Sequence, residues 1–539
     1  MYGIDNYQVM EKEKVMRKAF SGLFVAILTL LILLPARMVM AEKVLYVAGN
    51  PNELGVTSFD PVRMELGHEA LALVYDRLVE WGADGEYYPG LAESWTISDD
   101  GLTLKMKLKQ GVTFHDGSPF NAEVVKWFFK ALEIGPSAYM VGAIDHVEIN
   151  GPYDITVIFK HPEPNIFFNF AQLFMGIPSM EAWKKAGEDF GTKVVVGSGP
   201  YKFDSWSPGD KLVLVKNPDY TWGPGFVKNK GPAKIDKLIF RDTKEESTRF
   251  LELKTGKLDV VYALPTMFID KVKQDKNLQV IRMPGRELYH MVMNTSVPPL
   301  NDKLVRKGIA LAVDQVSITK NVFANAGKPA FAYLLDSLPE NKVPEKDLIR
   351  YNPEAAKAAL DEAGWKPGPD GVRVDKDGKR LELKMLAKNE SSYRRTAEVV
   401  QAQLAAVGVD AKITLLDSST IRSHLKNGEH QLVVRSYNWE NADILEWFLN
   451  STRLGYPNAA FWHDNESDYL MQKAMAHSRN PQERIENFKA YHSYLLNQYV
   501  WAPIYLPDQV FGVSKRLIRP ADSLDRRILG QGILDCDMK

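Results

Sequence analysis

The chain has 539 residues, of which 45% are hydrophobic and 25% are charged, and its formal net charge is −1. This length is enough for two or three units with their own cores, and the composition is ordinary for a soluble globular protein. A net charge near zero with no basic face argues against nucleic acid as a partner. The single cysteine, Cys536, excludes a disulfide within the chain and a cysteine-cluster metal site.

Residues 1–41 have the pattern of a secretory signal peptide. Basic residues precede an apolar run from Ala19 to Pro35, and a small side chain stands at Ala41, after which we expect cleavage. An uncleaved membrane anchor is the alternative, because the run approaches the roughly 20 residues that span a bilayer. No cysteine near the cleavage point could carry a lipid, so the periplasm is the expected compartment. The start of translation is left open between Met1 and Met16.

The first half of the exported chain predicts a mixture of strands and helices. Residues 102–108 alternate apolar and polar side chains, as a one-sided strand does. Asn121 is placed to cap a helix whose first turn carries Glu123. The other elements expected here are a strand from residue 43, a helix over 69–81, a hairpin over 201–215, a helix over 248–256 and a strand over 257–261.

The second half alternates strands with helices of 10–15 residues, which is typical of an α/β lobe. Asn352 is the expected N-cap of a helix that has Pro353 in its first position. No element is assigned after Arg519, where the tail is polar and charged. The other expected strands cover 288–295, 381–385, 409–415 and 431–436, and the other helices 303–314, a segment ending at 408, and 468–499.

A hairpin in the middle of the chain carries a family signature. It reads Gly197-Ser-Gly-Pro-Tyr201, then Trp206-Ser-Pro-Gly-Asp210, then Asn217-Pro-Asp-Tyr220, and its two first glycines allow backbone conformations closed to other residues. This order resembles the extracellular solute-binding proteins of family 5, the peptide/nickel transporter class. The blocks 90–95 and 111–125 are similar to the same pattern, and the likeness spans roughly residues 43–513.

The resemblance implies an α/β fold of two lobes, the periplasmic-binding-protein type II fold, with an extra small subdomain on the first lobe. A hinge between the lobes closes them on a ligand in the cleft. The expected division is a signal peptide over 1–41, a first lobe over 42–290 with its subdomain over about 82–195, a second lobe over 291–505, and a return to the first lobe with a C-terminal tail over 506–539.

The sequence carries no enzyme motif of the kinds that can be recognised from spacing. It has no Gly-x-Ser-x-Gly elbow, no phosphate-binding Gly-x-x-x-x-Gly-Lys-Ser/Thr loop and no His-Glu-x-x-His. His115 and Asp116 are interpreted as parts of a turn, since no nucleophile stands in their motif. The nearest histidines, His424 and His430, do not share a helical face. We therefore expect a binding protein without a metal site or a cofactor.

The candidate ligand contacts fall into four chemical groups. Two aromatic side chains would stack on the ligand, two acids would pair with an amine, three arginines would bind a carboxylate, and three residues would contact the ligand from the first-lobe side. For the aromatic residues the alternative is core packing, and for two of the arginines it is a solvated helix face. In the order of the groups the candidates are Trp439 and Tyr437; Glu440 and Asp443; Arg435, Arg394 and Arg395; and Tyr289, His290 and Asn294.

The loop after residue 436 departs from the pattern of peptide-binding members. Those members usually have Trp, then an Asp, then Asp-Pro before a Phe-Leu pair, whereas here Trp439 leads to Asp443-Ile and Phe448-Leu449. The Asp that would hold a peptide amino terminus has no obvious equivalent. The ligand is left open among a peptide, a nickel or other metal chelate, an opine-like compound and another small polar solute. The expected protein partners are the permease and ATPase of an ABC importer, and the expected state is monomeric. An exported hydrolase and a periplasmic chaperone are the rival functions.

Overall fold

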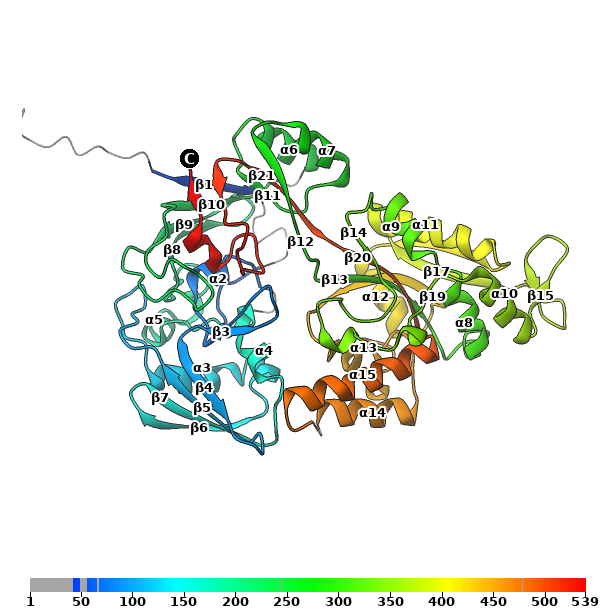
Figure 1. Cartoon of the computed structure of the whole chain (residues 1–539), viewed down its shortest axis with the longest axis horizontal. Helices are drawn as coiled ribbons and strands as arrows, with labels where there is room; N and C mark the ends of the chain where they lie inside the picture. Colours follow the sequence, from blue (N-terminus) through cyan, green and yellow to red (C-terminus); the bar gives the residue numbers. More distant parts are fainter. Residues whose placement is uncertain (1–41, 49–55, 65–66, 244, 477) are drawn as a thin grey trace, which may run out of the picture. The chain divides into compact units, whose positions relative to one another are not determined.

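The computed structural model describes residues 42–48, 56–64, 67–243, 245–476 and 478–539 (Figure 1). The signal peptide predicted over 1–41, and the choice of start residue, lie outside the described residues. Within the described ranges, no helix is both long enough and apolar enough to span a bilayer.

The first lobe is built on a seven-stranded sheet with the strand order β12-β21-β11-β1-β10-β9-β8. The central strand β1 lies parallel to β10 and β11, and the signature hairpin β8–β9 forms one edge, as its alternating pattern predicted. The strands are β1 Val44–Ala48, β8 Tyr201–Ser207, β9 Lys211–Lys216, β10 Lys237–Arg241, β11 Val260–Val261, β12 Leu278–Met283 and β21 Gln509–Ser514. The helices α5 Met180–Ala186, α6 Glu246–Lys254 and α7 Ile269–Gln274 belong to the same half of the chain.

A separate four-stranded antiparallel sheet, in the order β4-β5-β7-β6, forms the predicted subdomain with its own apolar core. Its helix α3 buries Val125, Phe128 and Phe129, and the Asn121 Oδ1 atom accepts the Val124 amide at 3.2 Å, which confirms the predicted cap. The elements are β4 Ala92–Ile97, β5 Thr103–Leu108, α3 Ala122–Leu132, β6 Ile144–Gly151, β7 Asp154–Phe159 and α4 Ile166–Phe170, and the small pair β2 Val79–Trp81 and β3 Tyr87–Pro89 precedes them.

The second lobe has a six-stranded mixed sheet in the order β14-β20-β13-β19-β17-β18. β17 lies parallel to β18 and β19, whereas β13 lies antiparallel to β19 and β20. Its strands are β13 Glu287–Met293, β14 Gly327–Pro329, β17 Glu382–Lys388, β18 Asp410–Leu416, β19 Leu432–Asn438 and β20 Trp501–Pro507. Its helices are α8 Lys303–Leu311, α9 Gln315–Asn321, α10 Pro353–Glu362, α11 Ser391–Ala405, α12 Ser418–Lys426, α13 Ile444–Leu449, α14 Asn465–Met475 and α15 Pro481–Gln498.

The chain passes between the two large sheets twice, from β12 to β13 and from β20 to β21 (Figure 1). These two crossings touch each other, because a Cβ atom on Gly285 would lie 1.5 Å from the carbonyl oxygen of Pro507. A side chain at Gly285 would therefore push the two crossings apart. The predicted lobe boundaries, 290/291 and 505/506, fall inside β13 and β20, each of which lies wholly in the second sheet.

The signature glycines serve close packing rather than unusual backbone angles. Neither Gly197 nor Gly199 has a positive φ, so the expectation of a special backbone conformation was wrong. A Cβ atom on Gly197 would lie 2.0 Å from the Val74 carbonyl oxygen, and one on Gly199 would lie 2.4 Å from that of Leu73. Between the two glycines, Ser198 donates a hydrogen bond of 2.9 Å to the buried Asp76 carboxylate. The motif thus anchors one strand of the hairpin against a short helix.

The structure differs from the predicted elements in three places. The helix expected over 69–81 is one turn, α2 Leu71–Val74, because Tyr75 is extended and the Val74 carbonyl accepts the Gly199 amide. The helix expected over 468–499 is two helices, and Asn480 caps the second. The C-terminal tail, to which the sequence analysis assigned no element, contributes β22 Leu517–Ile518 and β23 Asp537–Met538. It also buries Leu529 and Leu534 in the first-lobe core.

The His115–Asp116 pair has the structural role that its turn suggested. The Gly197 amide donates to His115 Nδ1 at 3.4 Å, and Nε2 lies 3.0 Å from the Gly199 carbonyl oxygen. Burial lowers the pKa of His115 to about 4, so the imidazole is neutral and its Nε2–H is the donor. Asp116 accepts hydrogen bonds from the Ser118 and Ser179 hydroxyls. His115 thus fastens this loop to the signature motif, and Asp116 fastens it to Ser179.

Candidate ligand-binding site

The parallel strands β17 and β19 end at the same edge of the second sheet, at Lys388 and Asn438. Helix α11 begins directly after β17, at Ser391, with no side-chain cap on its first turn. In open α/β sheets ligands bind outside the carboxyl ends of the strands. This edge, together with the loop over 438–443 that follows β19, is therefore the candidate site.

The pleat of the sheet separates residues that stand next to each other in the sequence. The register between β13 and β19 pairs Tyr289 with Ser436 and His290 with Arg435. Successive side chains of a strand point to opposite faces. Tyr289 and Ser436 therefore share one face with Glu287, whereas His290 and Arg435 share the other. We call these the hydroxyl face (Glu287, Tyr289, Ser436, Asn438) and the packed face (Leu288, His290, Arg435, Tyr437).

The hydroxyl face carries a connected group of polar side chains. The Tyr289 hydroxyl donates to Ser392 Oγ at 3.3 Å, and the Tyr393 and Ser436 hydroxyls share a hydrogen bond of 2.6 Å. The rings of Tyr289 and Tyr393 lie 5.0 Å apart, and the Lys388 ammonium lies 4.8 Å from the Tyr393 ring. These groups come from β13, β17, β19 and the first turn of α11. Of them, the sequence predicted only Tyr289 as a ligand contact.

Glu287 is the acid on the hydroxyl face. Burial raises its pKa, and the Ser436 and Tyr393 hydroxyls and Lys388 oppose that effect. Among the described residues no ion pair neutralises this carboxylate. A half-buried carboxylate is stabilised by a cationic partner, so Glu287 is suited to an ammonium group. The sequence offered one usable signal, since Glu287 and Tyr289 have the spacing of residues on one face of a strand.

Two predicted contacts on the packed face are enclosed by the second lobe. His290 is fully buried with its ring 4.3 Å from that of Trp501, and burial lowers its pKa to about 3. Tyr437 is 5% exposed, and its hydroxyl donates to the Tyr333 carbonyl oxygen at 2.6 Å. These contacts give both side chains a place in the core, and their role in ligand binding stays a prediction.

Arg435 is the cation of the packed face. Its guanidinium lies 4.6 Å from the ring of Phe448 on α13. Burial is the largest cause that lowers its pKa, and Arg422 adds to the effect. Within the described chain no acid forms an ion pair with Arg435. It remains a predicted partner for a ligand carboxylate.

Three other predicted residues lie away from the carboxyl edge or at the surface. Asn294 is fully buried and donates to the His430 carbonyl oxygen at 3.0 Å, so its amide holds a turn. Arg394 is exposed on α11 and donates to Asn389 Oδ1 at 2.6 Å. Arg395 is also exposed on α11. The two arginines are placed on a solvated helix face, which was the alternative given to them.

The 438–443 loop brings two other candidates into direct contact. The indole Nε1 of Trp439 donates to Asp443 Oδ1 at 2.5 Å, and burial raises the pKa of Asp443 to about 6. The Trp439 ring packs edge-on against Phe168 of the first lobe, at a centroid distance of 5.6 Å. Trp439 thus faces the first lobe while its indole is oriented by Asp443.

The next residues of the loop also contact the first lobe. Glu440 forms an ion pair with Arg526 and lies 3.4 Å from Arg286 Nε. The Asn441 side chain donates to Asn165 Oδ1 at 2.6 Å and accepts a hydrogen bond from Arg484 at 2.5 Å. Glu440 is therefore already neutralised by protein groups. Arg526 lies in the tail to which the sequence assigned no element.

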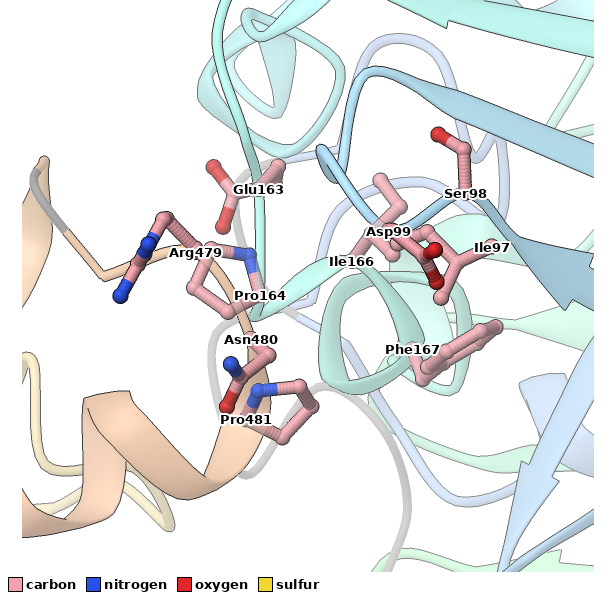
Figure 2. Close-up of a pocket in the computed structure, with 10 residues that line it drawn as sticks. All are labelled: Ile97, Ser98, Asp99, Glu163, Pro164, Ile166, Phe167, Arg479, Asn480 and Pro481. Carbon is pink, nitrogen blue, oxygen red and sulfur yellow. The ribbon is translucent and has the colours of Figure 1, made fainter.

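The structure also has a cavity of about 240 Å³ that is lined by other residues (Figure 2). First-lobe residues such as Glu163 and Phe167 line one side, and Arg479, Asn480 and Pro481 line the other. None of the predicted ligand contacts lines it. Within the part of the chain that the structure describes, no three His, Cys, Asp or Glu side chains are grouped to hold a metal ion.

The comparisons with known proteins agree with this architecture. The family model of the bacterial extracellular solute-binding proteins, family 5 Middle, matches residues 86–455. "Di/tripeptide-binding protein 2" of Pseudomonas aeruginosa (strain UCBPP-PA14) is 26% identical over 493 residues, which cover 84% of this chain and 88% of the relative. The glutathione-binding protein GsiB of Escherichia coli (strain K12) is 25% identical over 447 residues, covering 79% and 82%.

A solved structure shares the fold over almost the whole chain. NikA from Brucella suis in complex with Fe(III)-EDTA matches with a TM-score of 0.78 and 22% identity, covering 92% of this chain and 100% of that chain. The two-lobe α/β fold that the resemblance implied is confirmed. The chain belongs to the bacterial extracellular solute-binding proteins, family 5.

Proposed function

We propose that this protein is the periplasmic solute-binding component of an ABC importer, and that it carries a short peptide or a related small polar solute to the permease. The family match over residues 86–455 is the observation that carries the proposal. The relatives named for di/tripeptides and for glutathione support a peptide-like solute. The family is one of solute-binding proteins, and we infer that this member binds its solute without catalysis, as a monomer that requires no cofactor.

Transport requires a protein that signals whether it is loaded. Two sheets joined by two crossings allow one lobe to rotate against the other. A solute that contacts both lobes only when they meet stabilises the closed form and shifts the population toward it. The permease and its ATPase then recognise the closed shape at the inner membrane.

We assign the solute's ammonium group to Glu287. The departure of the loop from the peptide-binding pattern leaves the usual amine partner without an equivalent. At the carboxyl edge, Glu287 supplies a carboxylate that forms no ion pair with any residue the structure describes. The hydroxyls of Tyr393 and Ser436 offer further hydrogen bonds there. Trp439 covers the solute from the loop side. This assignment predicts a ligand with a free amine.

A thermal-shift panel tests the function. Residues 42–539 are unfolded and refolded to remove any bound solute, and then screened against dipeptides, tripeptides, glutathione, nickel–histidine and an opine. A specific solute at about 100 times its Kd adds about 2.7 kcal/mol of stability and raises Tm. If only nickel–histidine stabilises the protein, the solute is a metal chelate rather than a peptide. If no small solute shifts Tm, the proposed function is contradicted.

N-acetylated dipeptides test the amine assignment separately. Acetylation removes the positive charge that Glu287 would bind while leaving the rest of the peptide unchanged. We expect the acetylated peptide to give little or no shift where the free peptide gives a clear one. Equal shifts would remove Glu287 as the amine partner while leaving the solute-binding function intact.

A further inference from the structure

The C-terminal tail brings an arginine to the surface that the second lobe contacts. The guanidinium of Arg526 lies 3.5 Å from the centroid of the Trp81 ring, and its Nη1 donates to the Gly82 carbonyl oxygen at 3.4 Å. Both contacts are within the first lobe. Its Nη2 donates to the Glu440 carboxylate, which belongs to the 438–443 loop of the second lobe. Arg526 is thus fixed on one lobe and ion-paired to the other.

A second arginine, from the crossing between β12 and β13, completes the group. Arg286 Nη2 donates to the Arg526 carbonyl oxygen at 2.7 Å, and Arg286 Nε lies 3.4 Å from Glu440 Oε2. The Glu440 carboxylate therefore lies between a tail arginine and a hinge arginine. The side chains of Glu440, Arg526 and Arg286 are 16%, 12% and 17% exposed.

This degree of burial makes the group energetically significant. Salt screens exposed ion pairs efficiently and partly buried pairs much less. Removing one partner of a buried pair also leaves the other charge uncompensated. Burial lowers the pKa of Arg526, and Glu440 opposes that effect, so separating them would cost the favourable interaction.

The aromatic contacts of the same loop reinforce the ion pair. Trp439 packs on Phe168, and the Phe168 ring packs edge-on against the Trp81 ring at a centroid distance of 5.4 Å. The Arg526 guanidinium lies over the same Trp81 ring. The apolar and the ionic contacts of the loop therefore meet on one first-lobe surface around Trp81.

We propose that Glu440, Arg526 and Arg286 form an ionic latch that holds the 438–443 loop against the first lobe, so that lobe closure depends on the C-terminal tail. The latch gives Glu440 a role in closing the lobes rather than in contacting the solute. Protein groups alone make these contacts, so the latch raises the closed population before any solute binds. A protein whose competent state is more populated has a higher apparent affinity.

Single-molecule energy transfer between the lobes tests the latch without any solute. Cysteines introduced by Lys184→Cys on α5 and Glu362→Cys on α10 carry the dyes, since both residues are exposed. The native Cys536 is buried and burial raises the pKa of its thiol to about 12, so it reacts poorly. The refolded protein is compared with Glu440→Gln, Arg526→Gln and the double variant. Because no solute is added, this result is independent of the proposed ligand.

We expect each single variant to lower the ratio of short-distance to long-distance molecules about tenfold, as the loss of a partly buried ion pair predicts. The double variant should shift the ratio by less than the product of the two single shifts, because the two side chains act on each other. Multiplicative shifts in the double variant, or an unchanged ratio in Glu440→Gln, would overturn the latch.

Glu446→Gln is the matched control. Glu446 accepts from Arg453 Nε at 3.0 Å, and its side chain is 14% exposed, similar to Glu440, but both residues belong to the second lobe. We expect this variant to keep the wild-type distance ratio. A shift as large as that of Glu440→Gln would mean that any lost ion pair loosens the protein, and would also overturn the latch. Thermal unfolding of each variant verifies that it is folded.

Discussion

The two faces of β13 and β19 carry residues of similar chemistry with different surroundings. On the packed face, His290 and Tyr437 are enclosed by Trp501, Tyr333 and other core residues, and His290 Nδ1 and the Tyr437 hydroxyl each meet a backbone carbonyl oxygen. On the hydroxyl face, Glu287 and Ser436 meet hydroxyls from α11 at the carboxyl edge of the sheet. Residues that alternate along one strand are thus divided between core and candidate site.

This difference teaches that residue type alone does not identify a binding group. Tyr437 and His290 on the packed face have the chemistry to contact a solute, yet both side chains are enclosed by the core. If the comparison is right, substitutions of His290 and Tyr437 on the packed face should strongly reduce stability, whereas substitutions at the carboxyl edge should reduce affinity and cost at most about 1 kcal/mol of stability.

The largest effect is expected from Tyr437→Ala on the packed face. Truncation removes a buried ring from the second-lobe core and the hydrogen bond to Tyr333, so we expect a loss of about 3–5 kcal/mol of unfolding free energy. Urea denaturation measures it. The control is Ser436→Ala, the next residue on the opposite face, for which we expect a loss of about 1 kcal/mol. Equal losses would break the comparison.

The pH dependence of stability gives a second test of the difference between the packed face and the hydroxyl face. Burial lowers the pKa of His290 to about 3 from its ordinary 6.5, so the unfolded chain binds the proton first as the pH falls. Stability is therefore complete above about pH 6.5 and decreases from there toward pH 3. At pH 5 the histidine contributes a loss of about 2 kcal/mol.

Urea titrations between pH 7 and 5 measure this slope. His290→Gln should reduce the slope of unfolding free energy against pH by the contribution of one titrating imidazole. A substitution of the exposed His146 should not reduce this slope. Burial also lowers the pKa of His430 and of His492 to about 4. The stability of the His290→Gln variant should therefore still decrease as the pH falls. A slope unchanged in His290→Gln would place that imidazole outside the core.

Glu287→Gln tests the hydroxyl face. Losing the charge should weaken binding of an amine-bearing solute about tenfold, or about 1.4 kcal/mol, and leave the solute-free Tm nearly unchanged. Calorimetry with the best solute of the thermal-shift panel measures this. Glu382→Gln, at the exposed start of β17, is the control and should bind as the wild type does. Unchanged affinity in Glu287→Gln would contradict the assignment.

Trp439→Ala should weaken binding somewhat less, by about 1 kcal/mol, because the proposed site places its partly buried indole over the solute, where it also contacts Phe168. The protein should remain folded. Trp447→Ala, on the exposed face of α13, supplies a tryptophan control with no expected loss of affinity. Full affinity in Trp439→Ala would remove the 438–443 loop from the site.

The smallest effects are expected from Arg394→Ala and Arg395→Ala. Both side chains are exposed on α11, so each substitution should change stability by less than about 0.5 kcal/mol and leave affinity unchanged. Binding of the same solute measures it. A tenfold loss of affinity in either variant would extend the site along α11.

Local pattern predicted most of the elements that build the site. The alternation at the start of β17 and the helical repeat of α11 appear in the sequence because each segment has one apolar face, and Asn121 and Asn352 cap helices as expected. The family signature also followed from residues close together in the chain. One of the exceptions is the segment 69–81, where a helical pattern ends after one turn and the Val74 carbonyl oxygen accepts the amide of the distant Gly199.

The sequence by itself determined many of the local strands and helices and the signature of a solute-binding family, because periodicity and turn residues act over short distances. The two lobes were expected from the family resemblance that this signature carries. Only the tertiary structure decided which side chains of β13 share the hydroxyl face with Ser436. It also decided that the polar tail places Arg526 beside Glu440. Those residues are far apart in the chain, and their meeting depends on how the strands pair and where the crossings return.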